Sequence, residues 1–126
     1  TTATTGNAAD FGDLSTSRYD LAACSSATRG VSIGGIFDAS PEIMEYVTIA
    51  STGNATDFGD IAETKEHAGT SSSTRGLSIG GANSYGNLNK IDYITIASVG
   101  NTTDFGDLTA AKRHPSATSN GHGGLS

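Results

Sequence analysis

Short segments in which apolar and polar residues alternate occur along the whole chain. Residues 76–79 (Gly-Leu-Ser-Ile) alternate small or polar with aliphatic side chains, and residues 93–98 (Tyr-Ile-Thr-Ile-Ala-Ser) are rich in β-branched types. A period of two places successive side chains on opposite faces of a strand. Residues 13–23 come nearest to a helical pattern, but they lack a continuous apolar stripe. The pattern predicts an all-β chain built from short strands.

These segments recur at a nearly constant spacing. Gly-Asn-Ala-Ala-Asp-Phe-Gly-Asp-Leu begins at Gly6 and returns in closely similar form at Gly53 and Gly100, two steps of 47 residues (53 − 6 and 100 − 53). A second block, Thr-Arg-Gly-Val-Ser-Ile-Gly-Gly from Thr28, returns as Thr-Arg-Gly-Leu-Ser-Ile-Gly-Gly from Thr74. The chain therefore contains three repeats of about 47 residues, and repeated supersecondary units are expected to pack on one another.

Each period predicts four short antiparallel strands. The first lies in the small residues 24–26 or 71–73, the second in 76–79, the third in 93–98 and the fourth in 103–105. Gly100-Asn101 suits the positive φ angles of a two-residue hairpin turn between the third and fourth strands. The glycine of Asp-Phe-Gly-Asp permits a β-bulge in the fourth strand.

The order of these blocks resembles the kelch repeat, in which a strand ends in Gly-Gly and is followed by a Tyr and a later aromatic residue. The two matches are Ile33-Gly34-Gly35 with Tyr46 and Phe58, and Ile79-Gly80-Gly81 with Tyr93 and Phe105. The chain departs from that family by having Phe where Trp is usual, and its first and last copies are incomplete. The resemblance implies a β-propeller of four-stranded antiparallel kelch-like blades.

The resemblance also predicts how the chain is divided. We expect a single repeat domain over 1–126, with a half blade at 1–20, blades at 21–66 and 67–113, and a second half blade at 114–126. Thr1 aligns with Thr48, which places the entry in the third strand, and Ser126 aligns near Ser78 or Ile79 in the second strand. We expect either a homo-oligomer, with two chains completing a six-bladed ring, or a segment of a longer array. An open β-solenoid is disfavoured by the Gly-Asn hairpin turns.

Composition and charge limit the partners. Hydrophobic residues make up 35% of the chain and charged residues 16%, so the low-hydrophobicity, high-charge signature of disorder is only half present. The net charge is −6 with scattered Lys and Arg, which argues against a nucleic-acid partner. No apolar run is long enough to cross a bilayer, so no membrane partner is expected. Cys24 is the single cysteine and cannot form an intrachain disulfide.

Several chemical motifs are present, but none predicts catalysis, a metal or a cofactor. Asp-Phe-Gly occurs three times without the other kinase motifs, and no nucleophile elbow accompanies the many serines. His67, His114 and His122 match no zinc signature, although His67 and His114 lie 47 residues apart (114 − 67). The repeated Asn and Asp could present oxygens to calcium, yet we favour bonds to their own turns.

Residues that recur in each copy are interpreted as scaffold. We expect Arg29 and Arg75 to lie beside a repeated Asp and tie blades together, with anion binding as the alternative. The expected structural positions are Asp13, Asp60, Asp107, Arg29, Arg75, Phe11, Phe58, Phe105, Tyr46 and Tyr93.

Function is expected where the copies differ. The loops that follow Gly35 and Gly81 differ in length and chemistry, and loops on a rigid scaffold commonly carry binding. Their candidate ligand-binding residues are Phe37, Asp38, Asn83, Tyr85, Asn87 and Lys90.

We therefore expect a non-catalytic module for protein or glycan binding or for structural assembly. The alternative is a propeller-type carbohydrate-active enzyme, which would gather carboxylates in one pocket. The wording of the repeats also resembles that of repeats in large proteins of marine phages. That resemblance implies a virion or fibre component, and hence a virion or extracellular location.

Overall fold

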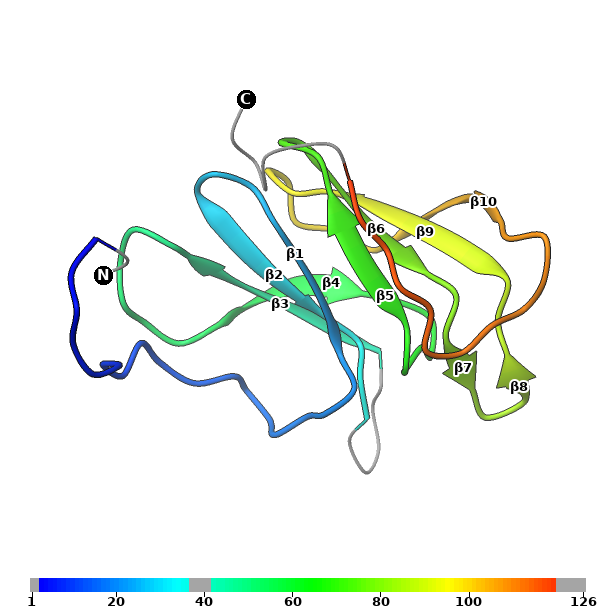
Figure 1. Ribbon diagram of the computed structural model, residues 1–126, viewed down its shortest axis with the longest axis horizontal. Helices are drawn as coiled ribbons and strands as arrows, with labels where there is room; N and C mark the ends of the chain where they lie inside the picture. The colour runs from blue at the N-terminus through cyan, green and yellow to red at the C-terminus, as the bar shows by residue number, and fades with distance from the viewer. Residues whose placement is uncertain (1–2, 37–41, 120–126) are drawn as a thin grey trace.

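The computed structural model describes residues 3–36 and 42–119, and this part of the chain is all-β (Figure 1). It contains no helix, and accordingly none that is long and apolar enough to cross a membrane. Its strands are β1 (Ala22–Ser25), β2 (Arg29–Ile33), β3 (Ile43–Thr48), β4 (Thr56–Asp60), β5 (Ala68–Ser71), β6 (Arg75–Ile79), β7 (Ala82–Asn83), β8 (Gly86–Asn87), β9 (Lys90–Thr95) and β10 (Thr103–Asp107).

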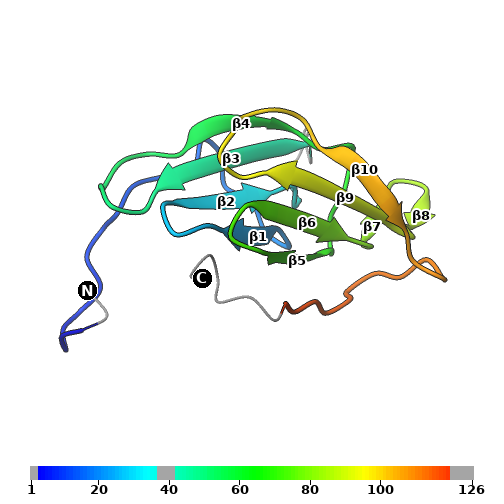
Figure 2. The same cartoon turned by 90° about the horizontal axis from the view of Figure 1, so that it is seen from above.

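Eight of the strands form two equivalent four-stranded antiparallel sheets. The first has the order β1-β2-β3-β4 and the second the order β5-β6-β9-β10. Their registers correspond, since Val31 is opposite Tyr46 in the first sheet and Leu77 is opposite Tyr93 in the second. Figure 2 shows β4 and β10 on one side of the molecule and β1 and β5 on the other. The prediction of four antiparallel strands per period is confirmed.

The predicted strand limits are shifted at several places, and β9 begins at Lys90 rather than at residue 93. β1 and β5 begin two to three residues before the expected first strands, and β9 ends at Thr95 rather than at residue 98. The reason at β9 is a turn, because the Ser98 amide donates to the Thr95 carbonyl at 3.1 Å. Ile96 lies just past the strand, yet its side chain is fully buried.

The predicted bulge in the fourth strand is confirmed in both sheets. The register shifts beside Gly59 in β4, and it shifts again between Asp104 and Gly106 in β10. Both glycines have positive φ angles, 141° at Gly59 and 149° at Gly106, a region that side chains with a Cβ rarely adopt.

The predicted Gly-Asn hairpin turn is wrong. Residues 49–55 connect β3 to β4. The Gly-Asn dipeptide in this connection forms hydrogen bonds with the preceding repeat and does not close the hairpin. The Gly53 amide donates to the Phe11 carbonyl at 2.8 Å, and the Gly100 amide donates to the Phe58 carbonyl at 2.7 Å. The error has a physical reason, because a Gly-Asn pair is compatible with both a turn and an extended segment that lies close to another backbone.

The core lies between the two sheets. A Cβ on Gly76 of β6 would collide with the Cys24 sulfur of β1, and a Cβ on Gly69 of β5 would collide with the Ala23 carbonyl. Glycine at these two positions therefore permits the close approach of the second sheet to the first. The buried cluster comprises Cys24, Val31, Ile33, Met44, Phe58, Ile61, Ile94 and Ile96.

Equivalent residues differ in burial according to whether a neighbouring sheet covers them. Phe58 of the first sheet faces the second sheet and is 2% exposed, whereas the equivalent Phe105 is 52% exposed. On the opposite faces, Ile96 is fully buried while the equivalent Ile49 is 47% exposed. The second sheet is therefore uncovered on the face that carries Phe105. The first sheet is uncovered on the opposite face, beside Ile49.

The segments predicted as half blades, 1–20 and 114–126, form no strand in their described residues 3–20 and 114–119, where Tyr19 makes a single bridge to Ile36. β3 ends at Thr48, the position that aligns with Thr1, so residues 3–20 correspond to the fourth strand and the connection after it. The later segment nevertheless follows the repeat, because Ser119 Oγ donates to the Ser71 carbonyl at 2.9 Å, as Ser71 Oγ does to the Ser25 carbonyl at 3.0 Å.

The equivalence of His67 and His114 is also corrected. Asp20, Glu66 and His114 share left-handed φ angles of 53°, 56° and 50°. Their backbones form a chain, since the Glu66 amide donates to the Asp20 carbonyl and the His114 amide to the Glu66 carbonyl. His114 therefore corresponds to Glu66, because the connection that precedes it is one residue longer.

Candidate functional site

The copy-specific loop after Gly81 is a small hairpin formed by β7 and β8. Asn83 Oδ1 accepts a hydrogen bond from the Tyr85 amide at 2.9 Å, which closes the turn. The Tyr85 side chain is 95% exposed and points to solvent from the tip. The hairpin therefore presents one aromatic ring on a short, internally bonded support.

The other predicted loop residues are engaged elsewhere or not described. Asn87 Oδ1 accepts from Arg113 Nε at 2.7 Å, and Lys90 Nζ lies 2.6 Å from Asp92 Oδ2. Asn87 is therefore bonded to the segment that follows β10, and Lys90 is paired within β9. Phe37 and Asp38 lie outside the described residues. Among the described residues of the predicted site, Tyr85 and Asn87 are exposed, whereas Asn83 and Lys90 are half-buried.

The repeated arginines have aromatic partners instead of the expected Asp. The Arg29 guanidinium lies 4.0 Å above the Tyr46 ring, and the Tyr46 ring meets Phe58 edge to face at 6.1 Å. Arg29 Nη1 also donates to the Ile96 carbonyl in the second sheet at 2.8 Å. A tie between units is thus present at Arg29, but its acceptor is the Ile96 carbonyl and not an Asp, and the Tyr46 ring belongs to the same unit as Arg29.

The second sheet repeats this arrangement. Arg75 lies 4.5 Å above the Tyr93 ring, and Tyr93 meets Phe105 edge to face at 6.2 Å. The described residues supply no carbonyl acceptor for the Arg75 guanidinium, whereas Arg29 finds one in the unit that follows it. The stack is therefore a property of each unit, and the hydrogen bond is a property of the junction between units.

The repeated Asn residues bind the neighbouring repeat and not their own turns. Asn54 Oδ1 accepts from the Asp13 amide at 3.0 Å, and Asn101 Oδ1 accepts from the Asp60 amide at 3.0 Å. The expectation that they bond their own backbone is wrong. Among the described residues, no three or more His, Cys, Asp and Glu side chains lie together where they could hold a metal ion.

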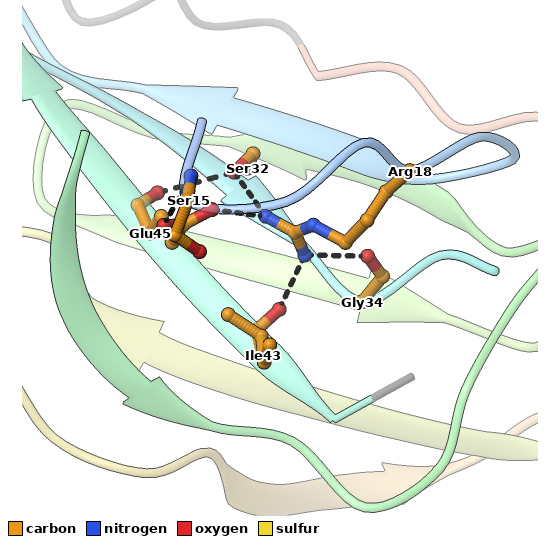
Figure 3. A network of polar contacts seen from close by, with 6 residues as sticks. All are labelled: Ser15, Arg18, Ser32, Gly34, Ile43 and Glu45. Carbon is orange, nitrogen blue, oxygen red and sulfur yellow. Dashed lines mark hydrogen bonds and ion pairs between the residues drawn. The ribbon is translucent and has the colours of Figure 1, made fainter. Parts of the chain in front are cut away.

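A buried ion pair that the sequence analysis did not single out lies at the first sheet (Figure 3). Arg18 Nη2 is 2.7 Å from Glu45 Oε2, and the two side chains are 0% and 3% exposed. Arg18 Nη1 donates to the Gly34 and Ile43 carbonyls, both at 2.7 Å. Several hydrogen bonds compensate the desolvation of the guanidinium, which makes Arg18 a tether for the segment before β1. The only sequence signal is an Arg that no other copy repeats.

His67 is buried and forms hydrogen bonds with both sheets. Its Nε2 is 3.0 Å from the Ile33 carbonyl of the first sheet, and its Nδ1 is 2.6 Å from Ser78 Oγ of the second. The carbonyl can only accept, so Nε2 carries the hydrogen and Nδ1 accepts from the serine hydroxyl. Burial lowers the pKa of His67 to about 4, so the imidazole is neutral near pH 7.

This serine and histidine do not form a nucleophilic site. A backbone carbonyl, and not a carboxylate, orients the imidazole, and both side chains are buried away from any substrate. Burial also raises the pKa of the Cys24 thiol to about 11, which keeps it protonated. His67, Ser78 and Cys24 thus contribute to the packing between the two sheets.

An apolar hollow of about 330 Å³ lies on the open face of the first sheet. Ala23, Gly30 and Val47 line it, and they are the equivalents of Gly69, Gly76 and Ile94, which the first sheet covers in the second unit. The hollow therefore lies on the face that corresponds to the covered face of the second sheet.

Comparison with known proteins does not assign a family. No family model matches the chain, and no curated protein matches its sequence. Any functional assignment consequently depends on the geometry described above.

Proposed function

We propose that the chain is a non-catalytic kelch-like β-propeller module that serves structural assembly. In such a module, successive four-stranded sheets are arranged around a common axis and each contacts only its neighbours. The observation that carries the proposal is that successive units contact each other through equivalent residues at both edges of their sheets. The resemblance to marine phage repeats favours a virion or fibre component in a virion or extracellular location.

The contacts at the two edges support this proposal. On the side of β1 and β5, each serine hydroxyl donates to the serine carbonyl of the preceding unit, from Ser71 to Ser25 and from Ser119 to Ser71. On the side of β4 and β10, each Gly-Asn segment binds the Asp-Phe-Gly-Asp segment of the preceding unit. Repetition of both contacts keeps the relation between one sheet and the next nearly constant, as a closed array requires.

The carboxylates favour the structural reading over the carbohydrate-active enzyme. Asp13, Asp60 and Asp107 are exposed at equivalent positions of three successive units, so they are spread along the array. The buried carboxylates Glu45 and Asp92 are paired with cations, Arg18 and Lys90. Two unpaired carboxyl groups facing one cleft are what glycoside hydrolysis needs, and these residues do not provide them.

The geometry of closure is tested by joining two copies of the chain in one gene. A linker with the sequence of residues 79–94 follows Ser126 and precedes the second Thr1, so that the repeat continues through the junction. We expect electron microscopy of the purified protein to show a compact six-bladed ring. An extended rod of stacked sheets would contradict the propeller.

A second candidate function, binding of a protein or glycan, is favoured by the exposure of Tyr85. Exposed aromatic rings on rigid supports are common anchors of binding surfaces. The labelled chain is applied to a printed glycan array beside its Tyr85→Ser and Tyr19→Ser variants, since Tyr19 is also exposed, at 63%, but lies away from the hairpin. We expect the Tyr85 variant alone to lose signal, by about tenfold. Equal signals from the two variants would rule out a glycan site on the hairpin.

A further inference from the structure

One backbone clamp joins successive units at two places in the chain. At the first, Gly53 and Ala55 donate their amides to the carbonyls of Phe11 and Asp13, at 2.8 and 2.9 Å. The amide of Asp13 donates in return to Asn54 Oδ1 at 3.0 Å. A Gly-Asn-Ala tripeptide thus binds the outer edge of an Asp-Phe-Gly-Asp segment by three hydrogen bonds.

The second clamp repeats the first, one period later. Gly100 and Thr102 donate to the carbonyls of Phe58 and Asp60, at 2.7 and 3.0 Å, and the Asp60 amide donates to Asn101 Oδ1 at 3.0 Å. In both clamps, a Cβ on the bulge glycine of the receiving strand would collide with the carbonyl of the bound glycine. The clamp therefore requires the bulge glycine as well as the tripeptide.

The chain contains one more donor tripeptide and one more receiving strand, and neither is bound to a partner of this kind among the described residues. Gly6, Asn7 and Ala8 repeat the tripeptide of residues 53–55, are exposed, and find no hydrogen-bond partner among the described residues. At the other end of the array, β10 is an edge strand with the same bulge, and no described atom lies within 4 Å of a Cβ on Gly106. The donor half and the receiving half thus lie at opposite ends of the described array.

We propose that residues 6–8 of one molecule bind the outer edge of β10 in a second copy of this chain. In this head-to-tail junction, Gly6 and Ala8 donate to the carbonyls of Phe105 and Asp107, and Asn7 Oδ1 accepts from the Asp107 amide. The inference deepens the proposed structural assembly and depends on it. The second copy is the occupant because the chain already makes this contact twice with itself, each time between a Gly-Asn segment and an Asp-Phe-Gly-Asp segment.

The burial of side chains beside the clamp supports the same junction. Phe58, whose strand is clamped, is 2% exposed, whereas Phe105 on the unclamped β10 is 52% exposed. Unpaired edge strands with an apolar neighbour readily add another strand. Because donor and receiver are different surfaces, the interface is heterologous and generates either a ring or a filament.

The junction is tested with two proline variants of the full chain. Ala8→Pro removes one amide donor from the tripeptide, and Asp107→Pro removes the amide that Asn7 would accept from. Ala8 is exposed and lies outside the strands, and Asp107 at the end of β10 is the equivalent of Asp60, whose amide donates to the following unit and not to the neighbouring strand, so each variant is expected to keep the fold of the monomer. Sedimentation equilibrium over a range of concentrations gives the association constant of each protein. We expect the unmodified chain to associate and each variant to associate at least tenfold more weakly.

Mixing the variants distinguishes a head-to-tail junction from other contacts. The Ala8→Pro chain keeps its receiving strand and the Asp107→Pro chain keeps its tripeptide, so an equimolar mixture retains one intact junction. We expect the mixture to form a heterodimer at concentrations where neither variant associates alone. The matched controls Ala55→Pro and Asp60→Pro alter the clamp inside the chain, and they should lower the urea midpoint of unfolding instead.

Each outcome decides the inference. A chain that stays monomeric at every concentration overturns it, as does association that both variants leave unchanged or a mixture that gains nothing. None of these results would contradict the propeller itself, because the joined two-copy protein tests ring closure without any junction between separate molecules.

Discussion

At the scale of the residue, His67 couples the packing of the two sheets to pH. The imidazole must remain neutral to accept from Ser78 while it donates to the Ile33 carbonyl. Its folded-state pKa, about 4, lies below the ordinary value of 6.5, so the unfolded chain binds a proton more readily than the folded chain does. The stabilisation is therefore fully present above pH 6.5 and is lost as the pH falls toward 4.

We predict that the free energy of unfolding decreases by about 2 kcal/mol between pH 7.5 and pH 5 because of His67 alone. Urea titrations at the two pH values measure the change. His67→Gln should remove most of this dependence, whereas His114→Gln should retain it, because the His114 side chain is exposed. A pH dependence that survives the His67 variant would contradict the assignment.

At the scale of the element, strand formation could be predicted from local pattern, but the partner of a segment could not. The alternation in residues 76–79 and the Gly in the fourth strand predicted β6 and the bulge. The Gly-Asn segments were misinterpreted because their local chemistry is that of a turn, while the Asn side chains bond to an Asp-Phe-Gly-Asp segment 41 residues earlier. Such a contact depends on how one unit lies against the next, which no local period encodes.

We predict that Asn101→Ala lowers the free energy of unfolding by about 1 kcal/mol, because the Asp60 amide loses its side-chain acceptor. Asn7→Ala should leave the unfolding of the monomer unchanged, since Asn7 makes no described contact. Urea midpoints give the comparison, and hydrogen exchange at the Asp60 amide should become faster only in the Asn101 variant. Equal effects of the two substitutions would show that the clamp contributes nothing within the chain.

At the scale of the whole molecule, two sheets with nearly the same sequence have different environments. The first sheet carries the core because the second covers one of its faces, and the second leaves the equivalent face open, as Phe58 and Phe105 show. The close approach depends on Gly76, which meets Cys24 across the interface. Cys24 is therefore a natural reporter of separation of the sheets.

We predict that Cys24 of the native chain reacts with Ellman's reagent only through transient opening, because the thiol is buried and its pKa is about 11. Gly76→Ala should increase the rate at least tenfold, since the added methyl group collides with the Cys24 sulfur. Gly30→Ala is the matched control, because a Cβ there meets only Val47 Cγ2 at an ordinary 3.6 Å. Similar rates in the two variants would contradict the proposed packing.

The sequence by itself determined the repeat, the all-β class and the four strands of each unit, because alternation and glycine placement act over a few residues. Only the tertiary structure decided the Arg18–Glu45 pair, the Asn clamps and the ring stacking of Arg29 on Tyr46. The first two join groups from segments that are not neighbouring strands, and the third joins two paired strands, so each depends on how separate segments lie against one another. Equivalent residues of repeats with nearly the same sequence therefore differ in exposure. The exposure of each depends on whether a neighbouring sheet covers it.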